Sequence, residues 1–154
     1  MTDIIIWHEQ KLALQLDILA KNPSVEVVLG HHQKIHSIDL INGATQSPCN
    51  IAPERVLSLG TSLFRKSAFD KVGNFDRDLK YSDDWDWFMR ARELGIEIAT
   101  CPNTVLFYRR HDRNITNQIE LGNRYTLRML KQSLDSRRHQ NHGLANSLPE
   151  ISNC

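Results

Sequence analysis

The sequence predicts an α/β fold in which a mixed sheet is flanked by helices. Segments rich in good helix formers alternate with short β-branched and aromatic runs, most of them bounded by glycine or proline. The expected helices are 7–21, 66–72, 83–94 and about 115–134, and the expected strands are 25–29, 56–64, 96–100 and 105–108. A chain of 154 residues is long enough to bury a core as one domain.

The remaining segments give weaker signals. Residues 1–6 resemble a short strand, residues 31–40 are expected to continue as a second strand, and residues 41–53 are turn-rich. Pro102-Asn103 predicts a turn, which would make 96–100 and 105–108 a hairpin. We expect residues 1–134 to form the domain and residues 135–154, which are polar and basic, to be a disordered tail.

Composition excludes several classes of function. The formal net charge is +1, which gives no reason to expect nucleic acid or an anionic membrane surface as a partner. No apolar run approaches the ~20 residues that span a bilayer, and no signal peptide precedes the first helix. The three cysteines are an odd number and widely separated, so we expect reduced thiols and a cytoplasmic protein.

The helix predicted at 83–94 carries three acids in its first turn. A helical wheel places most of its apolar residues over more than half of the circumference and leaves Asp86, Arg90 and Glu93 on a solvated stripe. The expected apolar arc consists of Trp85, Trp87, Phe88, Met89, Ala91 and Leu94. Asp84 lies in the middle of that arc, so its carboxylate is expected to face inward.

Two interpretations of Asp84 are open at this point. Acids in a first turn commonly complement the helix dipole and cap free N–H groups. A carboxylate fixed on a rigid helix at the mouth of a pocket can instead act as a general base.

Three other clusters invite a functional interpretation. Gly60-Thr61-Ser62 on an expected strand would let a ligand approach the backbone, or would simply pack. Residues 108–116 contain three arginines and His111, which could hold phosphate oxygens or a metal, or form a solvated strand end before a helix capped by Asn114. His31, His32 and His36 could bind zinc only if they were helical, and their neighbours favour strand and turn.

Four motifs in a fixed order resemble the second half of a family-two glycosyltransferase. They are Gly60-Thr61-Ser62-Leu63-Phe64-Arg65-Lys66-Ser67-Ala68-Phe69, Val72-Gly73-Asn74-Phe75-Asp76, Asp83-Asp84-Trp85-Asp86, and Tyr108-Arg109-Arg110-His111. The residues Trp7, Lys11, Gln15, Leu19, Asn22 and Pro23 are also similar to the helix that follows the metal-binding acids of that family. The resemblance covers about residues 7–116.

The resemblance implies a type-A glycosyltransferase fold and an inverting transfer of a sugar from a nucleotide sugar to an acceptor hydroxyl. It implies that Asp84 is the base, with Asp83 as the preceding acid and Trp85 beside the acceptor. Gly60, Thr61 and Ser62 would line the pocket beneath the donor sugar. Arg109 and His111 would contact the diphosphate and its divalent metal, Mn²⁺ or Mg²⁺.

Two departures from the family pattern modify this expectation. The nucleotide-binding, Rossmann-like half is largely missing, and Thr2-Asp3-Ile4-Ile5-Ile6 stands where the family has an acid-x-acid metal motif. We therefore expect that this chain alone transfers no sugar and that it is a truncated product or works with a separate donor-binding chain. The acceptor would be a saccharide or a lipid-linked saccharide.

Two alternatives remain besides the acceptor-side half. One is a non-catalytic saccharide-binding or assembly module that kept the fold, and the other is a metal-binding protein using the three histidines. If the chain is the acceptor-side half or the non-catalytic module, the missing half of the fold would leave strand edges and the run Ile4-Ile5-Ile6 exposed. Self-association through this apolar surface is therefore expected.

Overall fold

A mixed sheet forms the centre of the protein in the computed structural model, which describes residues 5–35, 37–39, 44–46, 52–79, 82–109, 119–140 and 151–153. This confirms the predicted α/β class with a mixed sheet flanked by helices. Two long strands, β2 (Val27–Ile35) and β7 (Ile98–Arg109), pair in parallel at its middle. Short strands pair with the outer edge of each of these two long strands.

The short strands are arranged in two pairs. On the outer side of β7, β1 (Ile5–Trp7) runs antiparallel and β8 (Ser152–Asn153) runs parallel. On the outer side of β2, β5 (Glu54–Arg55) and β6 (Ser62–Phe64) both run antiparallel. A separate hairpin joins β3 (Ser37–Asp39) to β4 (Ala44–Gln46).

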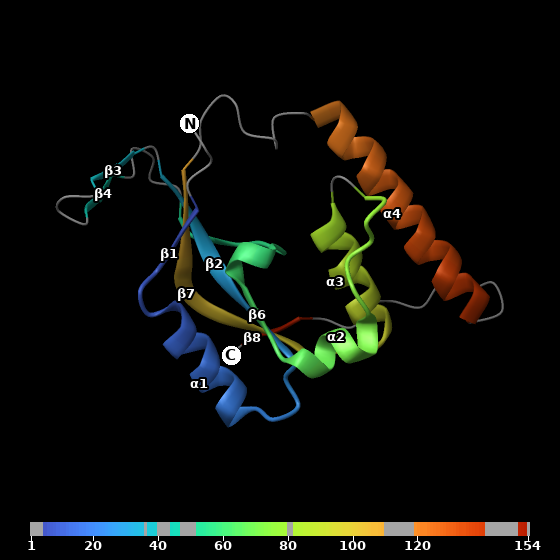
Figure 1. Ribbon diagram of the computed structural model, residues 1–154, viewed down its shortest axis with the longest axis horizontal. Helices are drawn as coiled ribbons and strands as arrows, with labels where there is room; N and C mark the ends of the chain where they lie inside the picture. Colours follow the sequence, from blue (N-terminus) through green and yellow to red (C-terminus); the bar gives the residue numbers. More distant parts are fainter. Residues whose placement is uncertain are drawn as a thin grey trace.

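Helices cover both faces of the sheet (Figure 1). On one face, α1 (Lys11–Lys21) packs through Leu19 onto Val28. On the other face, α2 (Lys66–Val72) and α3 (Asp83–Glu93) pack onto Val27 and Leu29 of the same strand. Because successive side chains of a strand point to opposite faces, β2 contributes to both cores and is buried on both sides.

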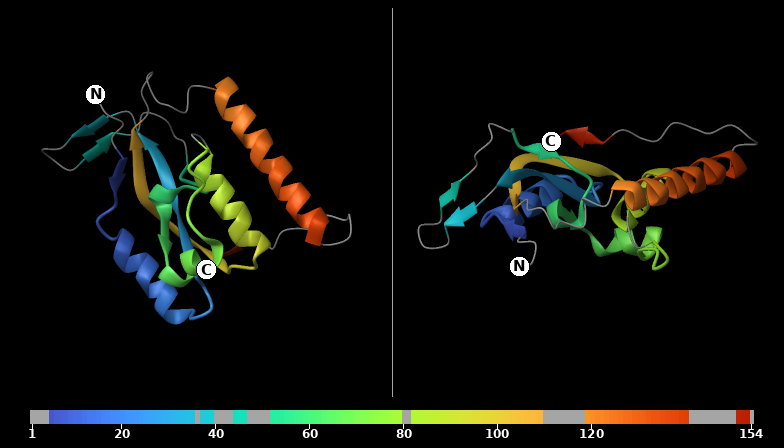
Figure 2. Two further views of the ribbon diagram at one scale, coloured as in Figure 1. Left: turned by 45° about the vertical axis from the view of Figure 1, so that its right-hand side comes forward. Right: turned by 90° about the horizontal axis from the view of Figure 1, so that it is seen from above.

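The helix α4 (Ile119–Gln140) packs against α3 and extends along the edge of the molecule (Figure 2). Met129 and Ser133 are buried on its inner face, whereas Leu127, Leu130 and Leu134 are exposed. Helical spacing puts Leu127, Leu130 and Leu134 on one stripe, but this stripe is not the face that packs. Among the described residues, no helix combines the length and the hydropathy needed to cross a membrane.

The predicted hairpin at 96–108 is wrong, because β7 is one strand of 12 residues that passes straight through Pro102. Its register against β2 shifts twice, between Leu29 and His31 and again between His31 and His32 of β2. Pro102 and Asn103 lie in the first of these irregularities, since Leu29 pairs with Thr100 and His31 with Thr104. A bulge accommodates a proline that cannot donate to the ladder. Pro102-Asn103 therefore interrupts the regular pairing of β7 with β2 but does not reverse the direction of the chain.

Gly30 allows β7 to return to β2 after this bulge. A Cβ atom built on Gly30 would lie 2.2 Å from Val105 Cγ2, and Val105 is fully buried. No side chain fits in that space, so glycine is required here for close approach of the two central strands.

Three further expectations need correction. The segment expected as one strand at 56–64 contains only β6, which is preceded by a 3₁₀ turn, η1 (Leu59–Thr61). The strand expected to follow residue 31 is part of β2, which runs unbroken to Ile35. The described parts of the tail beyond Asp135 are a helical end and a strand, not the disorder that their polarity suggests.

Candidate functional site

The first turn of α3 presents the acids that the sequence singled out. Ser82 adopts a left-handed conformation with φ of 64° and its carbonyl accepts the Asp86 N–H at 2.9 Å, which starts the helix. Asp83, Asp84 and Asp86 then follow in the first turn, where carboxylates complement the positive end of the helix dipole. The helix begins at the residue where its acids predict it.

Asp84 lies in the arc that the helical wheel assigns to packing, but it is not among the buried residues of α3. It is half-buried, and its Oδ1 accepts the backbone N–H of Trp85 at 2.8 Å. Burial raises the pKa of this carboxyl above its ordinary value, the Trp85 N–H opposes that rise, and the nearby charge of Asp83 adds to it. A carboxyl whose pKa is raised by burial is better suited to exchange a proton near neutral pH.

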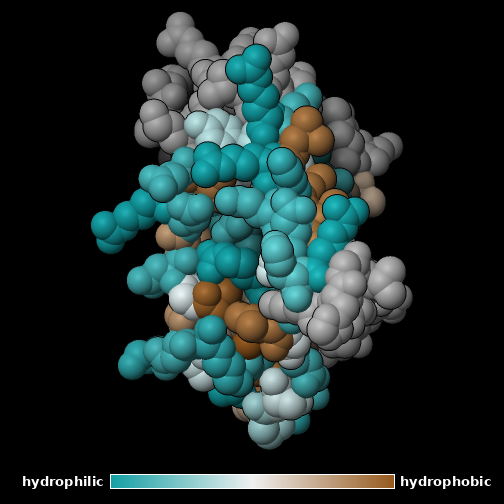
Figure 3. Space-filling model, turned by 90° about the vertical axis from the view of Figure 1, so that its right-hand side faces the viewer, coloured by the Kyte–Doolittle hydropathy of each residue, from teal (hydrophilic) through white to brown (hydrophobic). Residues whose placement is uncertain are grey.

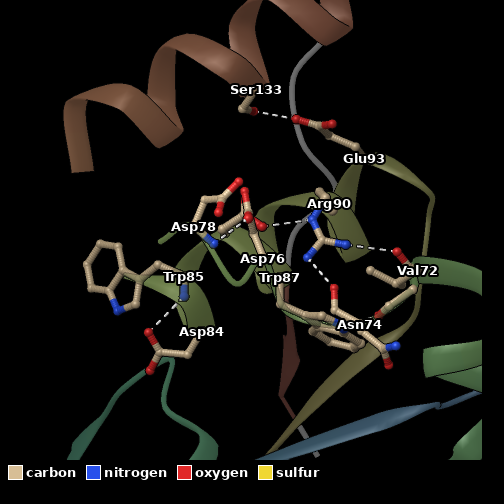
Figure 4. Close-up of polar contacts among 12 residues, drawn as sticks. Val72, Asn74, Asp76, Asp78, Asp84, Trp85, Trp87, Arg90, Glu93 and Ser133 are labelled. Atoms are coloured by element: carbon tan, nitrogen blue, oxygen red, sulfur yellow. Dashed lines mark hydrogen bonds and ion pairs between the residues drawn. The ribbon is translucent and has the colours of Figure 1, made fainter. Parts of the chain in front are cut away.

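Trp85 and Asp86 take places opposite to those that the wheel assigned. Trp85 is 45% exposed, whereas Asp86 is buried with only 8% of its surface exposed. The apolar arc that packs consists of Trp87, Phe88 and Ala91. Trp85 therefore stands as an exposed indole next to the Asp84 carboxylate, an arrangement in which a sugar ring could stack (Figure 4).

The Gly60-Thr61-Ser62 segment lies beside the N-terminal end of α3 (Figures 1 and 2). It forms η1 and the start of β6 rather than a continuous strand, and Thr61 and Ser62 are buried. Their hydroxyls are used within the turn: Thr61 Oγ1 donates to Val56 O at 3.2 Å and Ser58 O at 3.0 Å, and Ser62 Oγ donates to Ser58 O. These side chains shape the turn from within, and the N–H of the half-buried Gly60 donates to Ser58 Oγ at 3.3 Å.

A buried lysine and glutamine on α1 hold this turn from below. Gln15 Nε2 donates to Thr61 O at 2.8 Å and to Val28 O at 2.9 Å. Lys11 Nζ donates to Gln15 Oε1 and, at 3.1 Å, to Ser62 O. Lys11 and Gln15 are one helical turn apart, and their side chains are 1% and 0% exposed. Nothing in the sequence indicated this supporting role for Lys11 and Gln15.

Burial lowers the pKa of Lys11 to about 8, an effect that the charge of Cys101 opposes. Its ammonium lies 5.1 Å from the centre of the Trp7 ring, an additional favourable contact for a cation. Cys101 is a free, buried thiol. Together these groups tie α1, β6 and η1 into one unit.

The residues that the structure describes do not complete a metal or diphosphate site. Arg109 is the last residue of β7, opposite Ile35 of β2, and its side chain as well as His111 lie outside the described residues. Within the ranges that the structure describes, no group of three His, Cys, Asp or Glu side chains could hold a metal ion. His31 and His32 are in β2 and bond instead to Pro102 O at 2.8 Å and Glu54 Oε1 at 3.0 Å, and His36 is outside the described residues.

A cavity of about 420 Å³ lies on the opposite face of α3, between this helix, the 73–79 loop and α4. Arg90 forms one wall, because its guanidinium donates to Asp86 Oδ2 at 2.8 Å, Val72 O at 2.8 Å and Asn74 O at 2.9 Å (Figure 4). Glu93 forms another, where it accepts the hydroxyl of Ser133 from α4. The residues assigned to a solvated stripe thus line a cavity, and sequence periodicity could not show this because α4 supplies its far wall.

Comparison with known proteins adds no assignment. No protein-family model matches the chain, and no curated protein sequence matches it either.

Proposed function

We propose that this chain is the acceptor-side module of an inverting, family-two-like glycosyltransferase, with Asp84 as its general base. The observation that carries the proposal is the half-buried Asp84 carboxylate, whose pKa is raised by burial, next to the exposed indole of Trp85. The order of four sequence motifs supports it. The adjacent turn at Gly60, held by Lys11 and Gln15, is consistent with a preorganised pocket wall.

In this proposal Asp84 takes the proton of an acceptor hydroxyl while that oxygen attacks the anomeric carbon of the donor sugar. The carbon–oxygen bond to the diphosphate breaks as the new glycosidic bond forms, so the configuration inverts. A carboxylate is sufficient because the hydroxyl becomes acidic only as the bond forms. Asp83 keeps the local potential negative and favours the protonated product state of Asp84.

The donor and its divalent metal are assigned to residues outside the described part of the chain or to a separate donor-binding chain. Arg109 and His111 would contact the diphosphate in this arrangement. The Trp85 indole would contact the apolar face of a saccharide or lipid-linked saccharide acceptor.

Titration of Asp84 tests whether the pKa of its carboxyl is raised, which is the observation on which the proposal rests. We expect nuclear magnetic resonance of the side-chain carboxyl to give a pKa above the ordinary aspartate value, because the charged form is desolvated. Asp83→Asn should lower that pKa, since it removes a neighbouring negative charge, while leaving the fold intact. An ordinary pKa for Asp84 in the folded protein would remove the basis for a base at this position.

An assay of sugar transfer tests whether the isolated chain can use a donor by itself. The isolated chain with Mn²⁺ or Mg²⁺ and common nucleotide sugars is expected to show no turnover. Turnover that Asp84→Asn lowers by about 10²–10⁴-fold would support the base and contradict the assignment of the donor elsewhere. Saccharide binding at the first turn of α3 that is indifferent to both Asp84→Asn and metal would favour the non-catalytic module instead.

We further propose that two copies of the chain associate through β1. Among the described strands β1 is the outer strand on its side of the sheet, and its side chains Ile5 and Trp7 are 52% and 55% exposed. An unpaired edge with exposed apolar side chains is a template for a second strand. Light scattering should show a dimer that Ile5→Lys converts to monomer, while Leu127→Lys on the distant α4 has no such effect. A wild-type protein that stays monomeric at high concentration would contradict this.

A further inference from the structure

The cavity between α3, the 73–79 loop and α4 has properties that the proposed base does not explain. It faces away from Asp84, since its lining from α3 is Asp86, Met89, Arg90 and Glu93, on the opposite side of the helix. Figure 4 shows Asp84 and Trp85 on one side of the helix, and Glu93 and Ser133 on another. Its volume of about 420 Å³ falls within the range of about 300–1,000 Å³ that is usual for small-molecule sites.

The walls of this cavity are rigidly built. Arg90 links α3 to the preceding loop through the carbonyls of Val72 and Asn74, and its remaining contact is the buried Asp86 carboxylate. Glu93, whose side chain is 8% exposed, joins α3 to α4 through Ser133 and lies 3.9 Å from the guanidinium of Arg137. Preformed walls lower the entropic cost of binding a ligand.

Around the open side of this cavity, where Asn74 and Gln132 are exposed, some polar groups have no described partner. The side-chain amides of Asn74 and Gln132 and the hydroxyl of Ser136 form no hydrogen bond with other described residues. Asp76 uses only Oδ1, which accepts the Asp78 N–H at 2.9 Å. Two amides, one carboxylate oxygen and one hydroxyl can together donate and accept, which is what a polyhydroxylated ligand needs.

The charge of the lining decides between ligand classes. Three carboxylates and one guanidinium line the cavity, and the guanidinium is already hydrogen-bonded through Nε and both terminal nitrogens. A phosphate or another anion would meet these three carboxylates, and both Arg90 and the nearby Arg137 already have partners, so an anion is disfavoured. The thioether of Met89 supplies an apolar patch for the C–H face of a sugar ring.

We propose that this cavity binds a neutral saccharide, as a site separate from the Asp84 turn. Asn74, Gln132 and Ser136 hydrogen-bond its hydroxyls, and Met89 packs against the ring. The site does not depend on Asp84 acting as a base. In Figure 3, which views the side of the molecule that carries α4, hydrophilic side chains cover most of the face and hydrophobic ones form separate patches, as suits a polar ligand surface.

The test is a titration of the isotope-labelled chain, followed by its amide resonances, with D-glucose, N-acetyl-D-glucosamine, maltose and N,N′-diacetylchitobiose. At least one of these sugars should shift Asn74, Gln132 and Ser136 saturably, and inorganic phosphate should not. Ser136→Leu, which fills the cavity from α4, should weaken binding at least tenfold, about 1.4 kcal/mol. Asp84→Asn should leave binding unchanged, and unchanged amide dispersion in both variants shows that they are folded.

Three results would overturn the proposal. The first is the absence of saturable shifts with all four sugars, and the second is binding of phosphate in preference to them. The third is binding that Asp84→Asn abolishes and Ser136→Leu preserves, which would place the saccharide at the first turn of α3 and support the proposed base instead. Because the two variants lie on opposite faces of α3, failure of one site is distinguishable from failure of the other.

Discussion

Trp87→Ala is expected to lower the free energy of unfolding by about 3–5 kcal/mol, which would unfold much of a marginally stable domain. Trp87 is fully buried, and its ring centre lies 5.0 Å from that of Phe69 and 5.1 Å from that of Phe64. Its Nε1–H donates to Gly73 O at 2.9 Å. Truncation therefore leaves a large cavity and an unpaired carbonyl together.

Trp85→Ala is the matched control for this measurement. Trp85 is two residues away on the same helix, but it is 45% exposed, so its loss should change stability by no more than about 0.5 kcal/mol. Urea denaturation followed by circular dichroism measures both variants. Equal losses would show that the aromatic cluster does not anchor α3, and the orientation of Asp84 would then need another explanation.

The second large effect is a rise in stability with pH that depends on Lys11. Burial lowers its pKa from 10.5 to about 8 in the folded chain, so between these values the unfolded chain holds a proton that the folded chain has lost. Stability therefore rises from about pH 8 and levels off above about pH 10.5, whereas below pH 8 the full cost of burying the ammonium is present. The gain is on the order of 3 kcal/mol, at 1.36 kcal/mol for each unit that separates the two pKa values.

Lys11→Met isolates this contribution from that of the other titrating groups. The variant should lose the extra slope of unfolding free energy between pH 8 and pH 10.5, and denaturant melts at several pH values measure it. Lys21→Met is the control, because Lys21 is on the same helix with its side chain 70% exposed. If wild type and Lys11→Met show parallel pH profiles, the buried amine does not titrate as its environment implies.

The parts of the fold that local chemistry determines could be predicted from the sequence. The helix Lys66–Val72 has the predicted bounds and ends at Gly73, whose φ of 84° suits a glycine. The first turn of α3 begins at its acids, as the sequence predicts. These features depend on residues within one or two turns of each other.

The parts that could not be predicted depend on contacts distant in sequence. Pro102 could not be recognised as a bulge residue without knowing that β2 continues alongside β7. Asp86 has the wheel position of a solvated residue, but Arg90 pairs with it and the loop carbonyls hold that pair in place. Lys11 is a good helix former with no local sign that Ser62, 51 residues away, would receive its hydrogen bond.

The parallel pairing of β2 and β7 has a consequence for how the chain folds. Its register joins Val27 to Ile98 and Ile35 to Arg109, so about half of the chain must form a loop before the first of these bonds is made. The entropy cost of closing a loop grows only slowly with loop length. Proteins that depend on pairings between distant residues nevertheless fold more slowly, because that cost precedes the gain from the contacts. We therefore expect this chain to fold in milliseconds to seconds rather than microseconds. Until they pair, the apolar strands β2 and β7 are both exposed. The chain is most prone to aggregate during this period.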